Sequence, residues 1–171
     1  RTVPASGRVV FNGIEEALTR VLHQGCWSEQ RTFGSAVSDF TAAGPHHAFD
    51  VLHQGQKVGH VNWGLSGEHN QLNALAAIAA ADHVGVSPAV AAEALSRFHN
   101  VRRRMELRGS VANITVYDDF AHHPTAIRTT LDGLRLHVGQ ERRILAVFEP
   151  RSNTMKLGTM KAQLPWSLKE A

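Results

Sequence analysis

The sequence predicts an α/β protein made of two parts, and three patterns support this prediction. Residues 31–40 and 49–63 alternate apolar and polar side chains, residues 124–138 place apolar residues three and four apart, and residues 144–148 form an unbroken apolar run. The first pattern is typical of half-buried strands, the second of helices, and the third of a buried strand. Because strands and helices alternate along the chain, an α/β fold follows.

Strands dominate the prediction for the first 63 residues. The elements are, in order, a strand at 8–11, a helix at 14–23, a strand at 31–40, a loop at 41–47 and a strand segment at 49–63. Gly25 is expected to close the helix, since glycine readily takes the conformation found after a helix end. Gln54-Gly55-Gln56-Lys57 divide the last segment and predict a hairpin turn.

An alanine-rich helix is predicted at 69–81, followed by a helix that starts at Ser87-Pro88. The first turn of the alanine-rich helix carries His69, Asn70 and Asn73. Free N–H groups and the helix dipole favour a polar or anionic ligand there, and carboxamides are suited to pair with an adenine edge. The same pattern also fits a plain core helix, so the spacing leaves both interpretations open.

A basic link at 100–106 separates the two parts, and we place the boundary between residues 1–101 and 102–171. Strands are predicted beyond it at 105–108 and 114–117, with a turn at Gly109-Ser110. The three consecutive arginines of the link fit either a nucleic-acid patch or a phosphate clamp. The clamp is favoured, because the interleaved aromatic residues that stack on bases are missing, and because Arg offers bidentate donors.

Two carboxylates and two imidazoles lie in one predicted strand-to-helix turn. Asp118, Asp119, His122 and His123 follow a strand, and Pro124 is well placed as the first residue of the next helix. In open α/β sheets, ligands bind at the carboxyl ends of strands. With a buried parallel strand predicted at 143–148, this helix would complete a right-handed βαβ unit. The turn at 149–154 would then leave the same sheet edge, which predicts a site between the two polar turns.

Composition narrows the classes of function. Cys26 is the only cysteine, so an intrachain disulfide is impossible, and a buried thiol is more typical than a nucleophile. Neither a membrane-spanning run nor a signal peptide is found in the sequence. The formal charge is +3, and residues 87–171 hold thirteen Lys/Arg against eight Asp/Glu. A basic second part favours an anionic ligand, either nucleic acid or a phosphorylated small molecule.

The acidic and imidazole residues of this turn could serve three kinds of chemistry. A metal site formed by His122 and His123 is disfavoured, because adjacent side chains in a turn seldom bind one ion. A hydrolase using Asp119 and His123 lacks a nucleophile in an elbow context. A nucleotide site fits best, with a carboxylate on ribose hydroxyls, arginine on phosphate and amides on adenine.

Three motifs, in this order and spacing, resemble those of the Mur ligases of peptidoglycan metabolism. They are Gly67-Glu68-His69-Asn70-x-x-Asn73-Ala74-Leu75-Ala76-Ala77, Arg103-Arg104, and Tyr117-Asp118-Asp119-Phe120-Ala121-His122-His123-Pro124-Thr125. Residues 25–28 and 147–156 also resemble this family. The resemblance covers nearly the whole chain. It implies the second half of a central ATP-binding domain at 1–101 and the first part of a Rossmann-like C-terminal, peptide-binding domain at 102–171.

The resemblance implies an ATP-dependent ligase that forms a C–N bond in the cytoplasm. In this family ATP phosphorylates a UDP-muramyl carboxylate, and an amine then displaces phosphate from the acyl phosphate. The implied site residues are His69, Asn70 and Asn73 at adenine, Arg103, Arg104 and Asp119 at ribose and phosphates, His122 and His123 near the transferring phosphate, and Arg151, Ser152 and Asn153 near the incoming peptide. Positive charge and fixed donors suit the negative charge that develops in such a reaction.

The family's glycine-rich P-loop, its magnesium ligands and its N-terminal UDP-binding domain have no counterpart in this sequence. The resemblance therefore implies a fragment that is inactive alone, from a parent that uses ATP and Mg²⁺. Within the family, the sequence looks most like the branch that attaches L-Ala-γ-D-Glu-meso-diaminopimelate to UDP-N-acetylmuramate in peptidoglycan recycling.

Other functions stay open on the sequence alone. One is the branch that attaches L-alanine to UDP-N-acetylmuramate, and others are a non-catalytic nucleotide-binding module and a purely structural α/β domain. Under the ligase interpretation, neither nucleic acid nor a membrane is expected as a partner. The sequence specifies neither the oligomeric state nor a preference for tripeptide over longer peptides.

Overall fold

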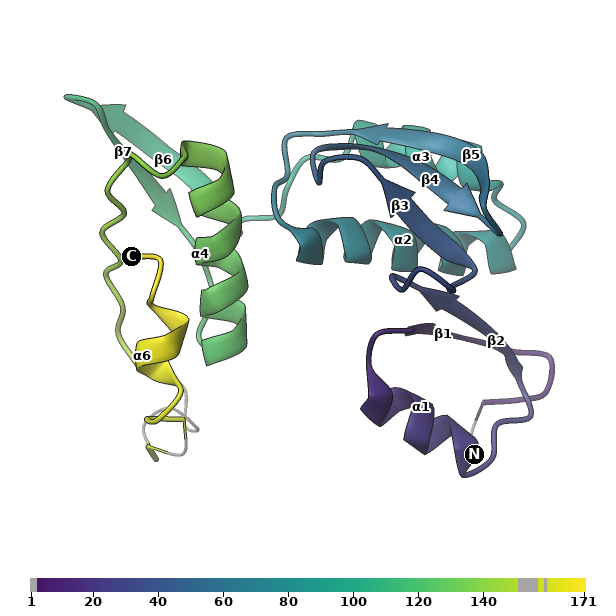
Figure 1. Ribbon diagram of the computed structural model, residues 1–171. Helices are drawn as coiled ribbons and strands as arrows, with labels where there is room; N and C mark the ends of the chain where they lie inside the picture. Colours follow the sequence, from purple (N-terminus) through teal and green to yellow (C-terminus); the bar gives the residue numbers. More distant parts are fainter. Residues whose placement is uncertain (1–2, 151–156, 159) are drawn as a thin grey trace. The chain divides into compact units, whose positions relative to one another are not determined.

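The fold is described from a computed structural model of the chain, for residues 3–150, 157–158 and 160–171. The chain forms two compact units (Figure 1). The first comprises Arg1–Leu65 and His69–Phe98, and the second comprises Ser66–Glu68 and His99–Ala171. Both units combine strands with helices, so the predicted α/β class is confirmed.

The first unit contains a five-stranded mixed sheet in the order β1-β2-β3-β4-β5. Its strands are β1 (Arg8–Asn12), β2 (Glu29–Phe33), β3 (Phe40–Ala43), β4 (Ala48–His53) and β5 (Gln56–Asn62). β1, β2 and β3 run parallel, whereas β4 is antiparallel to both β3 and β5. The predicted hairpin is therefore confirmed, with its turn at Gln54 and Gly55, which both have positive φ angles.

Three helices accompany this sheet. They are α1 (Glu16–His23), α2 (Glu68–His83) and α3 (Pro88–Ser96). The Ser87 hydroxyl caps α3 by accepting a hydrogen bond from the Val90 N–H at 3.4 Å, as its position before a proline predicts. α3 packs against β5 at Gly59, where an added Cβ would lie 2.8 Å from the Ala92 Cβ. Glycine is needed there because the helix approaches the strand so closely.

The core of the first unit lies between the sheet and α2. Its most deeply buried large side chains are Phe40, Phe49, Val51, Val61, Leu75 and Ile78. Phe49 and Val51 alternate along β4 with residues that face outward, as the period of a strand requires. Leu75 and Ile78 lie three residues apart on α2, so one side of this helix faces the core.

The predicted bounds of one strand, and of the loop that follows it, are wrong. Instead of continuing from 31 to 40, β2 ends at Phe33 and β3 begins at Phe40, taking residues 41–43 from the predicted loop. Gly34 has a φ of 98°, a value that breaks the extended backbone. Ser35 and Ser38 then form a turn, with their hydroxyl oxygens 2.8 Å apart. The apolar–polar alternation continues through this turn and hid it from the sequence pattern.

The turn between β2 and β3 is anchored by Asp39. Its Oδ2 accepts hydrogen bonds from the Thr32 N–H at 2.8 Å and the Thr32 hydroxyl at 3.0 Å. Burial would by itself raise the pKa of the Asp39 carboxyl. The two hydrogen bonds from Thr32 favour the ionised form and together leave this pKa below its ordinary value.

We predict that Asp39→Ala lowers the free energy of unfolding by about 1–3 kcal/mol at neutral pH, because two donors on Thr32 lose their acceptor. A carboxyl with a depressed pKa stabilises the fold above its ordinary pKa and loses that contribution as the pH falls through the folded pKa. The difference between variant and wild type should therefore shrink in acid. Urea unfolding at several pH values measures both effects. Glu93→Ala is the control, since its exposed pair with Arg97 contributes little.

The second unit contains a two-stranded antiparallel sheet and a long helix. Its elements are β6 (Glu106–Val111), β7 (Ile114–Asp118), α4 (Pro124–Val138) and α6 (Leu164–Ser167), which packs against α4. The predicted helix at 124–138 is confirmed. Pro124, Ile127 and Leu131 are buried on one face of it.

The hairpin turn in the second unit lies at Ala112 and Asn113, so the prediction of a turn at Gly109-Ser110 is wrong. The two turn residues have φ angles of 48° and 63°, which gives the twist that a two-residue hairpin requires. Gly109 lies inside β6, where the register shifts between Leu107 and Gly109. A glycine at this position fits an irregular pairing within the strand rather than a turn.

The predicted buried strand at 143–148 is also wrong, and with it the βαβ unit. This segment has no strand pairing among the described residues, and Leu145 and Val147 are 83% and 93% exposed. An apolar run becomes a buried strand only where neighbouring strands accept its backbone hydrogen bonds. In the described part of the chain, β7 pairs only with β6.

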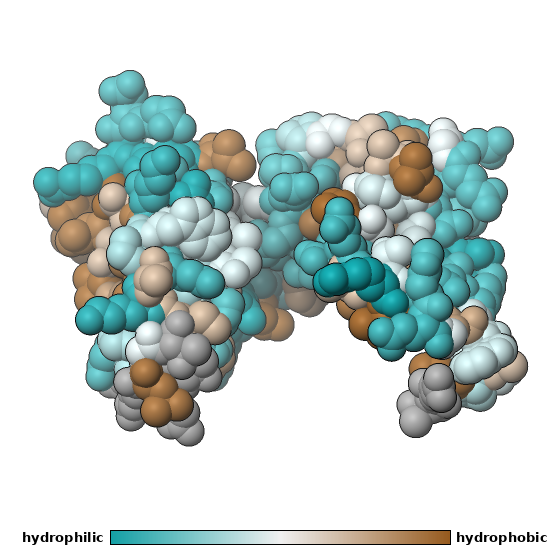
Figure 2. All heavy atoms as spheres, turned by 60° about the horizontal axis from the view of Figure 1, so that its bottom comes forward, coloured by the Kyte–Doolittle hydropathy of each residue, from teal (hydrophilic) through white to brown (hydrophobic). Residues whose placement is uncertain are grey.

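Apolar side chains reach the surface of both units (Figure 2). Trp27 and Val21 are exposed in the first unit, and Ile114 and Val116 in the second. Large exposed apolar areas are commonly sites of contact with another protein. Among the described residues, no helix combines the length and apolar character that a membrane span requires.

Candidate functional site

The first turn of α2 carries the residues predicted to contact a base. Gly67, with a φ of 90°, directly precedes the helix, which begins at Glu68. Asn73 is exposed, whereas His69 and Asn70 are half-buried and engaged in interactions. The next two residues, Ala74 and Leu75, are buried in the core of the first unit. The packing of α2 against the core therefore holds this turn in place.

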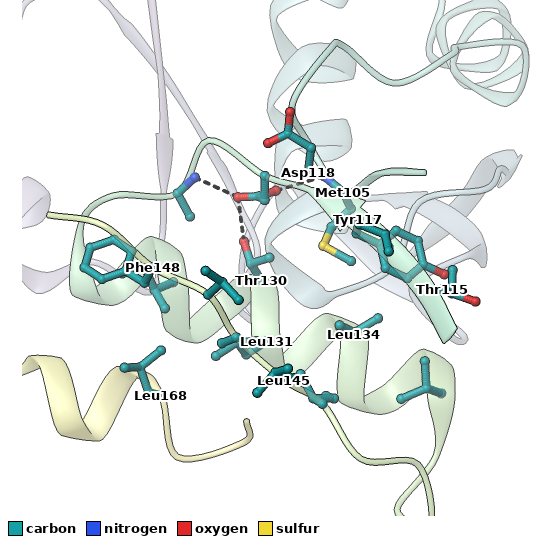
Figure 3. A pocket seen from close by; sticks show the side chains of 18 of the residues that line it. Met105, Thr115, Tyr117, Asp118, Thr130, Leu131, Leu134, Leu145, Phe148 and Leu168 are labelled. Atoms are coloured by element: carbon teal, nitrogen blue, oxygen red, sulfur yellow. Dashed lines mark hydrogen bonds between the residues drawn. The ribbon is translucent and has the colours of Figure 1, made fainter. Parts of the chain in front are cut away.

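In the second unit, the Asp119 carboxylate is surrounded by donors from three segments. Its Oδ2 accepts a hydrogen bond from the Met105 N–H at 2.9 Å, and its Oδ1 accepts one from the Ala121 N–H at 2.7 Å. The Thr130 hydroxyl lies 3.5 Å from Oδ1. Figure 3 shows these bonds as dashed lines, one of which ends at Thr130. Each oxygen of this carboxylate therefore accepts one backbone hydrogen bond within the protein and keeps a lone pair for a further donor.

Asp118, which the sequence placed in the same turn but to which it assigned no ligand group, is more available. Its Oδ2 lies 3.5 Å from the Arg103 Nε, and the two side chains are 37% and 63% exposed. An exposed ion pair of this kind contributes little stability and is readily rearranged by a ligand. In Figure 3 the Asp118 carboxylate points away from the apolar residues Leu131 and Leu134. The adjacent pair of aspartates was the available signal, but sequence alone does not tell which one faces outward.

The arginine link has an unusual backbone. Arg103 and Met105 have φ angles of 59° and 49°, which L residues rarely adopt. The Arg103 N–H donates to Glu106 Oε2 at 2.9 Å, and the Asn100 side chain donates to the Arg104 carbonyl. The Arg103 N–H, followed by the charge of Arg108, holds the pKa of the Glu106 carboxyl below its ordinary value. Local hydrogen bonds thus fix the link that carries the predicted phosphate-binding arginines.

The two histidines of the turn differ in their surroundings. His123 precedes α4, and its Nδ1 accepts a hydrogen bond from the Thr125 N–H at 3.3 Å, so its ring caps the helix. The His122 Nδ1 lies 3.1 Å from the Phe120 carbonyl, which can only accept. The His122 Nδ1 therefore donates to this carbonyl. Both side chains are exposed.

A large groove of about 1400 Å³ joins most of these residues in the second unit (Figure 3). Arg103, Asp118, Asp119 and His122 lie along its polar part. Its apolar part is lined from α4 and from residues 142–149. Arg104 and His123 lie outside its lining. The structure thus brings together three predicted site residues, Arg103, Asp119 and His122, and the neighbouring Asp118. Arg151, Ser152 and Asn153 lie outside the described residues.

Metal ligands were not predicted within this chain. Across the ranges that the structure describes, no group of three or more His, Cys, Asp or Glu residues could hold an ion. The described residues therefore offer no magnesium site to test.

Comparison with known proteins identifies the class of protein. Residues 103–165 match the family model of the Mur ligase glutamate ligase domain. Residues 103–165 are thus a Mur ligase domain, and the chain is similar along its whole length to Mur ligases, as its motifs predict. The match includes residues 103–106 of the arginine link, the Asp118-Asp119 turn and all of α4.

Comparison with individual relatives is more specific than the match to the family model. Over the whole chain, 51% of residues are identical to UDP-N-acetylmuramate–L-alanyl-γ-D-glutamyl-meso-2,6-diaminoheptandioate ligase of Escherichia coli K12. The solved structure of a murein peptide ligase from Psychrobacter arcticus is 42% identical in sequence, with a TM-score of 0.73. The match covers the whole of this chain and 37% of that chain. The UDP-N-acetylmuramate–L-alanine ligase of Dictyoglomus turgidum is 36% identical, over 89% of this chain and 33% of its own. The chain spans 38% of the Escherichia coli relative.

Proposed function

We propose that this chain is part of an ATP-dependent ligase that attaches L-Ala-γ-D-Glu-meso-diaminopimelate to UDP-N-acetylmuramate. The observation that carries the proposal is the higher identity, along the whole chain, to a ligase named for this peptide than to one named for L-alanine. Peptidoglycan recycling in the cytoplasm is the corresponding role, with links to cell-wall formation, cell shape and division. The fragment by itself is expected to be inactive.

In the first unit, the first turn of α2 is the proposed adenine contact. The carboxamides of Asn70 and Asn73 can each donate and accept a hydrogen bond, as the edge of adenine requires. His69 precedes them on the same turn. Support comes from the buried residues that follow, which fix this turn against the core.

In the second unit, the arginine link and the two aspartates are the proposed contacts for ribose and phosphates. Arg103 and Arg104 offer several N–H donors to phosphate oxygens. Our expectation from sequence assigned ribose to Asp119. Each Asp119 oxygen keeps a lone pair beside its backbone hydrogen bond, so Asp119 is still proposed at the ribose. The Asp118 carboxylate is exposed and held by a surface ion pair, and it is proposed as a second ribose contact.

The histidines of the turn are proposed to lie near the transferring phosphate. His122 is the better placed of the two for contact, since it lines the groove together with Asp118 and Asp119, whereas His123 lies outside the lining. His123 is proposed to act by holding the first turn of α4 in place. Protonated imidazole or arginine near a transferring phosphoryl group stabilises the charge that develops on it.

The remaining partners belong to the full-length protein. Arg151, Ser152 and Asn153 are proposed to contact the incoming peptide. ATP would be used with Mg²⁺, whose ligands are expected from parts of the parent outside this chain. Magnesium supplies charge neutralisation on the phosphates when it is bound.

Phosphate release by the full-length protein tests the proposed function. We predict release with ATP, Mg²⁺, UDP-N-acetylmuramate and the tripeptide, at least about tenfold faster than with L-alanine, because a site that contacts the whole peptide loses those contacts with a single residue. Omitting UDP-N-acetylmuramate is the control for ATP hydrolysis. Equal or faster release with L-alanine would contradict the proposal and assign the protein to the alanine-adding branch.

A further inference from the structure

Gly133 is buried on the side of α4 that lies opposite the apolar stripe of this helix. Pro124, Ile127 and Leu131 form that stripe, and all three are buried. A helix turns about 100° per residue, so Gly133, two residues after Leu131, lies about 200° further round the helix axis. The core that covers the stripe therefore does not account for the burial of Gly133.

The backbone of Ser66 and Gly67 covers Gly133 instead. A Cβ added at Gly133 would lie 3.5 Å from the Gly67 Cα and 3.6 Å from the Ser66 carbonyl oxygen. These are ordinary van der Waals distances, so a methyl group fits, whereas the outer carbons of a larger side chain would overlap this backbone. The stretch Ser66–Glu68 belongs to the second unit, although it is remote from α4 in sequence.

A glycine inside a helix needs a reason, because it loses more backbone freedom on folding than alanine does. Gly67 is buried as well, and its φ of 90° is a value that glycine adopts without strain. Two glycines from different segments thus meet where two backbones approach each other closely. Close approach of backbones is a common use of glycine.

This contact lies directly before the proposed adenine contacts. α2 begins at Glu68, the last residue of the stretch that the second unit includes. His69 and Asn70 follow in the same helical turn. Because a single residue separates Gly67 from this pair, a displacement of Gly67 would move the start of the helix that carries them.

We infer that Gly133 is a positioning residue for the proposed adenine contact. By having no side chain, it lets the Ser66–Gly67 backbone lie against α4, and this contact fixes the point at which α2 begins. The inference rests on the proposed function, in which the first turn of α2 meets the base. It deepens that proposal by adding a residue of α4 that acts through Gly67 and touches no ligand.

Calorimetric titration of the full-length protein with ATP and Mg²⁺ tests the inference. Gly133→Ala adds only the methyl group that fits, so its Kd for ATP should stay within about twofold of the wild-type value. Gly133→Val and Gly133→Leu add carbons that overlap the Ser66–Gly67 backbone. Their Kd for ATP should rise about fivefold and about twentyfold, because the start of α2 is displaced.

The titration separates positioning from stability, because it gives the number of binding sites as well as the Kd. If Gly133 only stabilised the second unit, its variants would contain less folded protein, and the folded molecules would keep the wild-type Kd. Gly64→Leu is the matched control, since Gly64 precedes Gly67 by three residues and a Cβ added there meets nothing within 4 Å. Its Kd for ATP should equal that of the wild type.

A wild-type Kd for ATP in Gly133→Leu would overturn the inference, and so would an equal rise in Gly133→Ala or in Gly64→Leu. Loss of the folded protein in Gly133→Val would also overturn it, because Gly133 would then serve the fold of the second unit alone. Failure of the proposed function is seen separately, as no ATP-dependent phosphate release by the wild type with either acceptor.

Discussion

Asp118→Asn in the full-length protein raises the KM for ATP about tenfold to hundredfold, the effect of losing a charge-assisted hydrogen bond to a ribose hydroxyl. The Asp118 carboxylate is held only by an exposed ion pair with Arg103 at 3.5 Å. Because that pair contributes little to the fold, the free energy of unfolding should stay within about 0.5 kcal/mol of the wild type.

Steady-state kinetics at varied ATP concentration measure this effect. Asp132→Asn provides a control with the same chemical change, because Asp132 pairs with Arg128 on α4 and lies outside the lining of the groove. Its KM for ATP should be unchanged. A wild-type KM for ATP in the Asp118→Asn protein would remove Asp118 from the nucleotide site.

Phe40→Ala should lower the free energy of unfolding of the first unit by about 3–5 kcal/mol. Phe40 is fully buried at the start of β3, and its ring stacks on His53 with 4.4 Å between ring centroids. It shares a core cluster with Leu75 and Ile78 of α2. Removing the ring leaves a cavity under the helix that carries the proposed adenine contacts.

Urea unfolding followed by circular dichroism measures the change. Phe98→Ala removes the same ring from an exposed position after α3 and should change stability by less than about 1 kcal/mol. Equal effects of the two substitutions would contradict the assignment of Phe40 to the core.

Local sequence determined the elements whose signals lie within one segment. α4 could be predicted with its bounds because Pro124 starts it and the apolar residues Ile127 and Leu131 repeat along one face. The β4–β5 hairpin followed from alternation around Gly55. The family could also be predicted, because its motifs are short runs of adjacent residues. These features depend on neighbours in the chain, which the sequence shows directly.

Tertiary structure decided the features that depend on distant partners. The segment 143–148 has the composition of a buried strand, yet strand formation requires a neighbouring ladder, and none pairs with it in the described part of the chain. The turn at Gly34 was hidden because the same alternation continues through it. Adjacent aspartates look alike in sequence. Their surroundings differ only when the β6–β7 hairpin brings Met105 to Asp119, because a hydrogen bond depends on which atoms meet in space.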